Sequence, residues 1–286
     1  MFSRLALIGV GYIGGSAALA ARRAGLGGRV TGYDVDPQAG PLALARGVVD
    51  EMADSAETAA AGASLVLLAA PVQSLAGLVR RIAGSLTPTA TVIDVGSVKQ
   101  PVVLEADAAL PDGRFAGCHP MAGAEHVGVG AADPEIFAGR ACFLCPSART
   151  SAGATRMATL FWQGLGCQVA SIEPSLHDRL MAAVSHLPHV AAFALAASLT
   201  DALPSIESNA LPGRPTTSLR DTIRIAASSP QVWRDILLAN REHLLPLVRE
   251  LEQRVSTIGA AMAAGDAAAL EAALVLGQAC RQRLVK

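Results

Sequence analysis

The chain has 286 residues, 51% of them hydrophobic, which is enough for one large or two ordinary domains with a sizeable core and is unlike the composition of a disordered chain. Its 23 basic and 24 acidic residues nearly cancel, so no strong charge attracts nucleic acid or an anionic membrane. We therefore expect a small-molecule partner, and an anionic one would have to be bound by a few local cations.

The cysteines and the amino-terminal residues indicate a cellular compartment. Five cysteines are scattered along the chain, and Met1 leads directly into an apolar run without the basic region or cleavage site of a secretory signal. These features predict a reduced, cytoplasmic protein. Cys142 and Cys145 have the spacing of a redox or zinc pair, but they lie in an apolar run and no second pair follows at metal-binding spacing. We interpret them as buried strand residues and predict no metal site.

An apolar run at residues 5–8 leads into Gly9-x-Gly11-x-x-Gly14, the pattern of a strand that turns sharply into a helix in dinucleotide-binding proteins. Gly9 would allow the tight turn, Gly11 would let the backbone approach a pyrophosphate, and Gly14 would let the helix pack closely on the strand. The free N–H groups at the start of that helix would face the phosphates.

A second short strand follows at residues 29–33 and ends in Asp34, the position of an acid that accepts hydrogen bonds from the adenosine ribose. A 2′-phosphate would be repelled by this carboxylate, and residues 35–40 contain no lysine or arginine to neutralise it. We therefore predict that the cofactor is NAD. The predicted cofactor-binding residues are Gly9, Gly11, Tyr12, Ile13, Gly14, Asp34, Ala70, Pro71 and Ser97.

The rest of the first half alternates helices with short apolar strands. We predict helices at residues 38–46 and 73–84, and strands at residues 64–69, 90–94, 115–118, 141–144 and 168–171. Continuous apolar strands are typical of a parallel sheet that is covered on both faces. The alternation predicts an α/β fold, a doubly wound Rossmann-type domain at residues 1–172.

From Glu173 onward the chain lacks β-branched runs and is rich in alanine and leucine, which predicts an all-helical domain at residues 173–286. The apolar stretch 190–199 is too short to span a bilayer and is interpreted as a buried helix. A longer helix carries an apolar seam and is closed by Gly265, with Pro246 kinking it or setting its start. Such a seam is usually buried within its own domain, and a homodimer through these helices is the alternative. Residues 203–218 are the longest candidate loop. The seam residues are Leu244, Val248, Leu251, Val255, Ile258 and Met262.

Polar side chains follow two neighbouring strands. The Ser97 hydroxyl and the Lys99 amine come after one strand, and His119 ends the next, so all three are expected at the carboxyl edge of the sheet, where open α/β sheets bind ligands. A histidine at this edge can accept a proton near neutral pH. The simpler interpretation of His119 is an ordinary strand-end histidine.

The second half has two further polar groups. Residues 185–189, Ser-His-Leu-Pro-His, are predicted to open its first helix, and Arg220 and Arg224 lie four apart on one helical face. The alternatives are that His186 and His189 lie on a helix surface and that the two arginines form surface ion pairs. Three further histidines are interpreted as solvated side chains: His126, His177 and His243.

Taken together, six motifs resemble the prephenate/arogenate (cyclohexadienyl) dehydrogenase family of tyrosine biosynthesis. The first is shared by many oxidoreductases, whereas the other five are specific, and together they cover most of the chain in order. They are Gly-Val-Gly-Tyr-Ile-Gly-Gly-Ser (9–16), Asp-Val-Gly-Ser-Val-Lys (94–99), His-Pro-Met-Ala-Gly (119–123), Ser-His-Leu-Pro-His (185–189), Arg-Asp-x-x-Arg-Ile-Ala (220–226) and Trp-Arg-Asp-Ile-x-x-x-Asn (233–240).

The resemblance implies an NAD(P)-dependent oxidative decarboxylation of a 4-hydroxycyclohexadiene and a dimer formed through the helical domain. It implies that His119 hydrogen-bonds the ring hydroxyl with Ser97 beside it, and that Arg224 anchors a substrate carboxylate. Ser185 and His189 would line the same pocket, and Trp233 would reach it near the subunit interface.

Two departures from the family pattern leave the choice between prephenate and arogenate open: residues 216–219 lack the usual glycines and aromatic residue, and His126 replaces a common lysine. One rival interpretation is a β-hydroxyacid dehydrogenase, but residues 177–200 lack the lysine it would use. Another is a nicotinamide-sensing protein without catalysis, which would not need His119 and Arg224 together.

Overall fold

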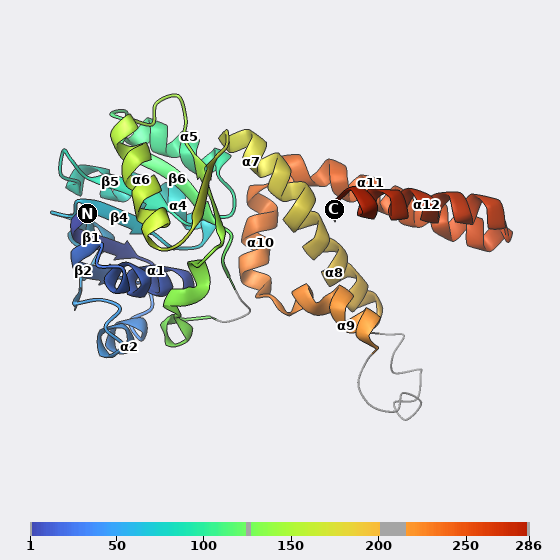
Figure 1. The fold of residues 1–286 in the computed structure, drawn as a ribbon, viewed down its shortest axis with the longest axis horizontal. Helices are drawn as coiled ribbons and strands as arrows, with labels where there is room; N and C mark the ends of the chain where they lie inside the picture. Colours follow the sequence, from blue (N-terminus) through green and yellow to red (C-terminus); the bar gives the residue numbers. More distant parts are fainter. Residues whose placement is uncertain (1, 124–126, 201–215, 285–286) are drawn as a thin grey trace.

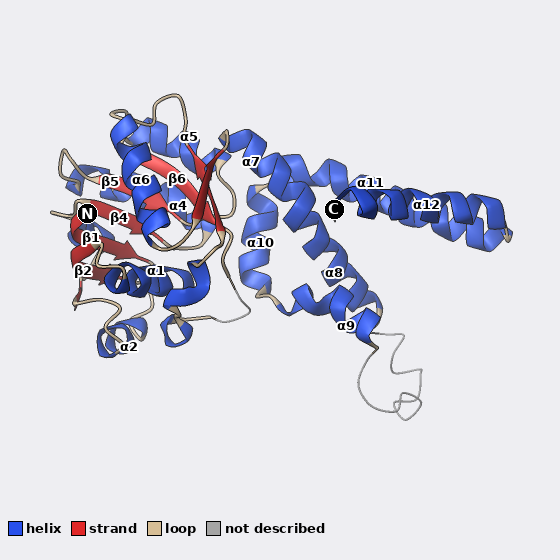
Figure 2. Cartoon of the chain, in the orientation of Figure 1, coloured by secondary structure: helices blue, strands red, loops and turns tan. Residues whose placement is uncertain are grey.

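The computed structural model describes residues 2–123, 127–200 and 216–284. It contains an eight-stranded sheet covered by helices on both faces, followed by a helical half that ends in a long helical hairpin pointing away from the sheet (Figures 1 and 2). The strand order is β3-β2-β1-β4-β5-β6-β7-β8. His126 and most of the predicted loop at 203–218 lie outside the described residues.

The first half matches the predicted alternation of strands and helices; the short elements β3 and α3 and the longer helices α5 and α6 were not predicted individually. The strands are β1 Phe2–Ile8, β2 Gly27–Tyr33, β3 Glu51–Met52, β4 Leu65–Leu68, β5 Thr91–Asp94, β6 Phe115–Pro120, β7 Ala141–Cys145 and β8 Gln168–Ser171. The helices are α1 Tyr12–Arg23, α2 Ala39–Ala45, α3 Ala56–Ala60, α4 Val72–Ile82, α5 Gln100–Ala109 and α6 Ala152–Gly164.

Burial on both faces of the sheet explains the continuous apolar strands. In β1, Leu5 and Leu7 pack on the side covered by α1 and α6, whereas Ala6 and Ile8 pack on the side covered by α3, α4 and α5. All four residues are at most 1% exposed. The apolar packing therefore fixes where the carboxyl ends of the parallel strands meet.

The sheet is mixed. Strands β1 to β6 are parallel, but β7 is antiparallel to β6, and β8 is parallel to β7. In the described part of the β6–β7 connection, the regular elements are short 3-10 turns at Val129–Ala131 and Pro134–Phe137. A connection without a crossover helix suits an antiparallel neighbour.

The helical half begins with one continuous helical run in which a π turn separates two α-helices. Helix α11 ends at Gly265, which has a left-handed φ of 65°, as predicted; Pro246 lies inside this helix and does not set its start. The elements are α7 Pro174–Met181, the π turn Ala182–His186, α8 Leu187–Ser198, α9 Thr217–Ile223, a 3-10 helix Arg224–Ala227, α10 Pro230–Ala239, α11 Arg241–Ala264 and α12 Ala267–Leu284.

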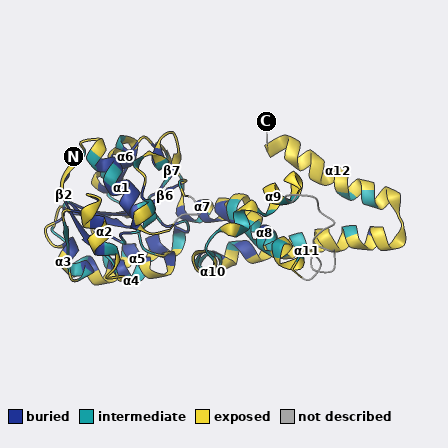
Figure 3. Cartoon of the chain, turned by 90° about the horizontal axis from the view of Figure 1, so that it is seen from below, coloured by how far each residue is buried: buried dark blue, intermediate teal, exposed yellow. Residues whose placement is uncertain are grey.

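Two expectations about burial were wrong for the single chain. Of the twelve residues of α8, all of them described, only Ala192 is buried. Along the apolar seam of α11, Leu244 is buried, but Val255 and Met262 are 61% and 65% exposed. Helices α11 and α12 pack on each other and leave much of their surface uncovered (Figure 3). The seam is therefore available to another molecule.

The continuous helical run Pro174–Ser198 is long and apolar enough to cross a membrane by length and composition, and 22% of its most apolar window is buried. A single such helix is only a weak indication of a membrane span. Its first part carries His177 and Asp178, which are buried and bonded to residues of the sheet half, and this is what a helix of a globular protein does.

Candidate active site

The turn between β1 and α1 has the shape of a dinucleotide cradle. A Cβ at Gly9 would lie 2.5 Å from the Ala69 carbonyl group, and one at Gly14 would lie 2.3 Å from the Gly9 carbonyl oxygen, so both positions require glycine. A Cβ at Gly11 would meet nothing within 4 Å, which leaves room for a ligand. Within the described chain, α1 has no capping side chain and no acid in its first turn. Its amino terminus therefore suits a phosphate group.

Asp34 is held beside this cradle. Its carboxylate accepts the Val10 N–H at 2.6 Å and the Asp36 N–H at 2.9 Å, and it has further lone pairs for ribose hydroxyls. Arg81, which contacts Tyr33 at the end of β2, is held by Glu57 through two bonds of 3.0 Å. The cradle and Asp34 together fit an NAD dinucleotide. Residues Ala70 and Pro71 lie in the connection between β4 and α4, with Pro71 immediately before the helix.

A buried ion pair supports the loop that carries Ser97. The Lys99 ammonium donates to the Asp94 carboxylate and, at 2.9 Å, to the Cys118 carbonyl, and both charged side chains are fully buried. Lys99 therefore does not line the carboxyl edge of the sheet as expected, because its ammonium group is buried against Asp94 and the Cys118 carbonyl of β6. Ser97 is half-buried, and among the described residues none has a recorded hydrogen bond to its hydroxyl.

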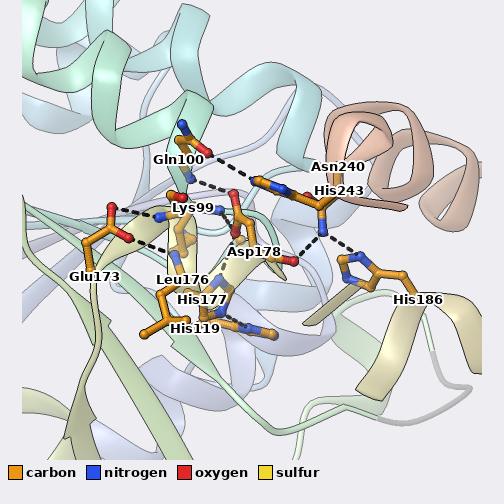
Figure 4. A network of polar contacts seen from close by, with 12 residues as sticks. Lys99, Gln100, His119, Glu173, Leu176, His177, Asp178, His186, Asn240 and His243 are labelled. Carbon is orange, nitrogen blue, oxygen red and sulfur yellow. Dashed lines mark hydrogen bonds and ion pairs between the residues drawn. The ribbon is translucent and has the colours of Figure 1, made fainter. Parts of the chain in front are cut away.

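His119 lies at the end of β6 and contacts a histidine that the sequence did not single out. Its Nδ1 is 2.9 Å from His177 Nε2, and His177 Nδ1 is 2.7 Å from Asp178 Oδ1 (Figure 4). The interpretation of His177 as solvated was wrong, because it is 0% exposed. The helical spacing of Pro174 and Met181 predicts a buried face that includes residues 177 and 178, so the sequence did contain this signal.

Burial keeps His119 neutral at physiological pH. Removal from water lowers the pKa of His119 well below 6.5, and the nearby His177, Lys99 and His186 lower this pKa further. A neutral imidazole has one nitrogen free to accept a proton. His119 is therefore suited to act as a base.

His186, on the π turn, lies near His119, and His189 follows it on α8. The motif at 185–189 does not open the first helix as predicted; it lies in the middle of the helical run, after α7. Asn240 Nδ2 is 2.8 Å from the Asp178 carbonyl oxygen and 3.0 Å from His186 Nδ1. Burial lowers the pKa of His186 to about 4. The Ser185 carbonyl accepts a bond from His189 Nδ1 at 2.9 Å.

Arg224 lies beyond α9, at the start of the 3-10 helix, and its charge lowers the pKa of His189, after the larger effect of burial. Arg220 forms an ion pair with Asp221 at 3.7 Å, whereas no acid among the described residues pairs with Arg224. Trp233 of α10 stacks on His189. The structure thus brings together His189, Arg224 and Trp233, but within the described part of the chain neither Ser97 nor Arg224 forms a hydrogen bond with His119.

A dinucleotide cradle and a neutral histidine at the end of a neighbouring strand are the features of a nicotinamide-dependent dehydrogenase. The family model of the prephenate dehydrogenase nucleotide-binding domain matches residues 17–171, and that of the prephenate dehydrogenase dimerization domain matches residues 173–275. The chain belongs to the prephenate dehydrogenase family.

Comparison with individual proteins supports the same family. The chain is 34% identical over 263 residues to a prephenate dehydrogenase of Bacillus subtilis, covering 90% of this chain and 70% of the relative. It is 31% identical to a cyclohexadienyl dehydrogenase of Zymomonas mobilis, covering 93% and 90%. The structure of Aquifex aeolicus prephenate dehydrogenase with hydroxyphenyl propionate and NAD+ superposes with a TM-score of 0.87 at 30% identity and covers 99% of both chains. The chain is accordingly an NAD-dependent oxidoreductase of tyrosine biosynthesis.

Proposed function

We propose that this chain oxidatively decarboxylates prephenate, arogenate or both, giving 4-hydroxyphenylpyruvate from prephenate and tyrosine from arogenate. The observation that carries the proposal is the buried, neutral His119 at the carboxyl edge of the sheet that also carries the NAD cradle. When bound, NAD+ supplies an acceptor for the hydride from the ring carbon that bears the hydroxyl. Loss of the ring carboxylate as CO2 then makes the ring aromatic, so the protein mainly has to position the substrate and accept a proton.

In this proposal His119 accepts the proton of the ring hydroxyl while the hydride leaves, and it returns that proton to the phenolate oxygen after CO2 has left. Ser97, on the loop that follows β5, orients that hydroxyl. Because Asp94 and Lys99 fix both ends of this loop and bond the backbone of Cys118, the position of Ser97 is tied to that of β6. His119 and Ser97 would hold the reacting hydroxyl between them.

We assign the side chain of the substrate to the helical half. Arg224 would bind its carboxylate, which persists into the product, because a cation bound to the departing carboxylate would stabilise the reactant more than the transition state. Its guanidinium suits a carboxylate through two parallel bonds. Ser185, His189 and Trp233 would line the same region, as their mutual contacts support.

We further propose a cytoplasmic homodimer of chains divided into residues 1–172 and 173–286. The dimer is supported by the match to a dimerization domain and by the exposed apolar side chains of the hairpin, on α11 and on α12: Val255, Met262, Leu274 and Leu276. Neither nucleic acid nor a membrane is a proposed partner. Sedimentation of the purified chain as a monomer at micromolar concentration would contradict the dimer.

The activity is tested by following absorbance in the NADH band with prephenate, then with arogenate, and with a β-hydroxyacid as a control. We expect reduction of NAD with one or both cyclohexadienyl substrates and none with the β-hydroxyacid. If NAD binds, as measured by fluorescence, but neither cyclohexadienyl substrate is oxidised, the proposal fails and a binding protein becomes the better interpretation.

A further inference from the structure

We propose that Asp178 and His177 are positioning residues that set the tautomer of His119, so that its Nε2 is the nitrogen that accepts the substrate proton. The inference rests on the proposed function only for the identity of the proton donor. The tautomer itself is a property of the protein without substrate, and it can be measured separately.

The hydrogen bonds run from Asp178 through His177 to His119, and we call this series the relay. It begins at the Asp178 carboxylate, whose orientation is fixed. Asp178 Oδ1 accepts the Lys99 N–H at 2.7 Å, and Oδ2 accepts the Gln100 N–H at 2.8 Å, so both oxygens are fixed by backbone groups at the start of α5. The same Oδ1 lies 2.7 Å from His177 Nδ1, and the Asp178 side chain is buried. A carboxylate only accepts hydrogen bonds, so His177 Nδ1 carries the proton.

The second step follows from the first. We take His177 as neutral: with its proton on Nδ1, its Nε2 is unprotonated, and this Nε2 lies 2.9 Å from His119 Nδ1. This bond forms only if His119 Nδ1 donates, which places the proton of the neutral His119 on Nδ1. Its Nε2, on the far side of the ring from His177, is left as the acceptor (Figure 4).

Packing holds the two rings in this arrangement. His119 meets His177 edge-on with ring centroids 5.1 Å apart, and Phe143 of β7 meets His177 edge-on at 5.6 Å. His177 thus cannot swing away to solvent. The charged and titratable groups around His119 come from the β5–α5 segment, from α7 and from the π turn, and they are Asp94, Lys99, His177, Asp178 and His186. The Lys99 ammonium is already bonded to Asp94, so it does not compete for His119.

His186 provides an internal contrast, because a different neighbour sets its tautomer. Asn240 must donate through Nδ2 to the Asp178 carbonyl oxygen, which identifies the amide nitrogen, and the same nitrogen faces His186 Nδ1. His186 Nδ1 therefore accepts, and its proton lies on Nε2. The two buried histidines are expected to have opposite tautomers.

The direct test is nitrogen NMR of enzyme labelled with 15N-histidine, without substrate and at neutral pH, with each resonance assigned from His119→Asn and His186→Asn. We expect His119 protonated at Nδ1 and His186 protonated at Nε2. In His177→Phe, His119 should lose its preference for Nδ1, whereas the control Leu176→Phe, at the exposed neighbouring position, should leave it unchanged. A wild-type His119 protonated at Nε2 would overturn the relay. Its unprotonated Nδ1 could then only accept a hydrogen bond, so His177 Nε2 would have to be the donor.

Kinetics separate the relay from the proposed function. His177→Phe should lower kcat by about tenfold or more with KM within about threefold, as for a histidine base left in the wrong tautomer. His177→Gln, whose amide can donate to Asp178 and accept from His119, should retain more of kcat than His177→Phe at equal NAD affinity and thermal stability. Full activity of His177→Phe with an inactive His119→Asn would refute the positioning role. An active His119→Asn would refute the assigned base and leave the tautomer result standing.

Discussion

The indole of Trp233 lies flat on the imidazole of His189, with ring centroids 3.5 Å apart and planes 19° from parallel. The two rings come from α10 and α8, and Trp233 also meets His186 edge-on at 5.9 Å. One aromatic side chain therefore sets the position of two histidines that follow one another on the helical run, and it does so from the helix that leads into Asn240.

Replacement of Trp233 by leucine should mainly weaken substrate binding. Stacked aromatic pairs contribute about 0.5–1.5 kcal/mol beyond their buried area, so we expect KM to rise roughly two- to tenfold with kcat changed less. The neighbouring exposed residue Val232 offers a control, as Val232→Leu should match the wild type. An unchanged KM with a strongly reduced kcat would show that Trp233 acts on the chemical step instead.

Arg224→Ala should raise KM by roughly tenfold or more while kcat changes much less, the pattern for binding lost equally from the ground state and the transition state. Arg220→Ala, one helical turn earlier, should have a smaller effect because Asp221 pairs with Arg220. Steady-state kinetics of the two single variants decide the assignment. If Arg220→Ala binds substrate worse than Arg224→Ala, the anchor has been placed on the wrong arginine.

His119→Asn should keep NAD binding but lower kcat by roughly 10²–10⁴, the usual range for a lost general base. The pH profile follows from the lowered pKa of His119. A base works unprotonated, so kcat/KM should hold as pH falls from 8 toward 6.5 and decline only below that value. A wild-type acid limb centred above pH 6.5 would contradict this assignment, as would a His119→Asn variant with more than about a third of wild-type kcat.

The cofactor preference should depend on Asp34. Two like charges ~4 Å apart at an effective dielectric of ~20 repel by up to ~4 kcal/mol, so even part of this gives a tenfold or larger preference for NAD over NADP in kcat/KM. Asp34→Ser should reduce the preference by improving use of NADP. Equal kcat/KM with both cofactors in the wild type would refute the role given to Asp34.

The stability of the fold should fall in mild acid because of His186. Its pKa is about 4 in the folded chain and near 6.5 when unfolded, so between these values the unfolded state binds more protons and stability rises with pH. A shift of this size corresponds to about 3 kcal/mol between pH 6.5 and 4. Urea unfolding at several pH values should show this slope, and His186→Asn should flatten it. Identical slopes for both proteins would place the acid sensitivity elsewhere.

Much of the sheet half could be predicted because strands buried on both faces appear in the sequence as continuous apolar runs. The run at 64–69 contains β4, and the glycines at 9, 11 and 14 mark the turn into α1. The antiparallel direction of β7 and the exposure of α8 have no such local sequence pattern, since they depend on what packs beside each element. The same holds for His119 and His177, which are 58 residues apart in the chain yet share a hydrogen bond. Local patterns can single out His119, and only the fold shows that His177 lies against it.

Hydrogen bonds and packing attach the first part of the helical half to the sheet. Asp178 is bonded to the start of α5 and His177 to β6, while Ile236 of α10 packs in the core beneath the sheet. These contacts anchor α7 and α10 to the sheet half, although both helices follow residue 172 in the chain. The start of α8 is joined to α10 by the stacking of His189 on Trp233. The surroundings of His119 are thus built by elements from both sides of residue 172.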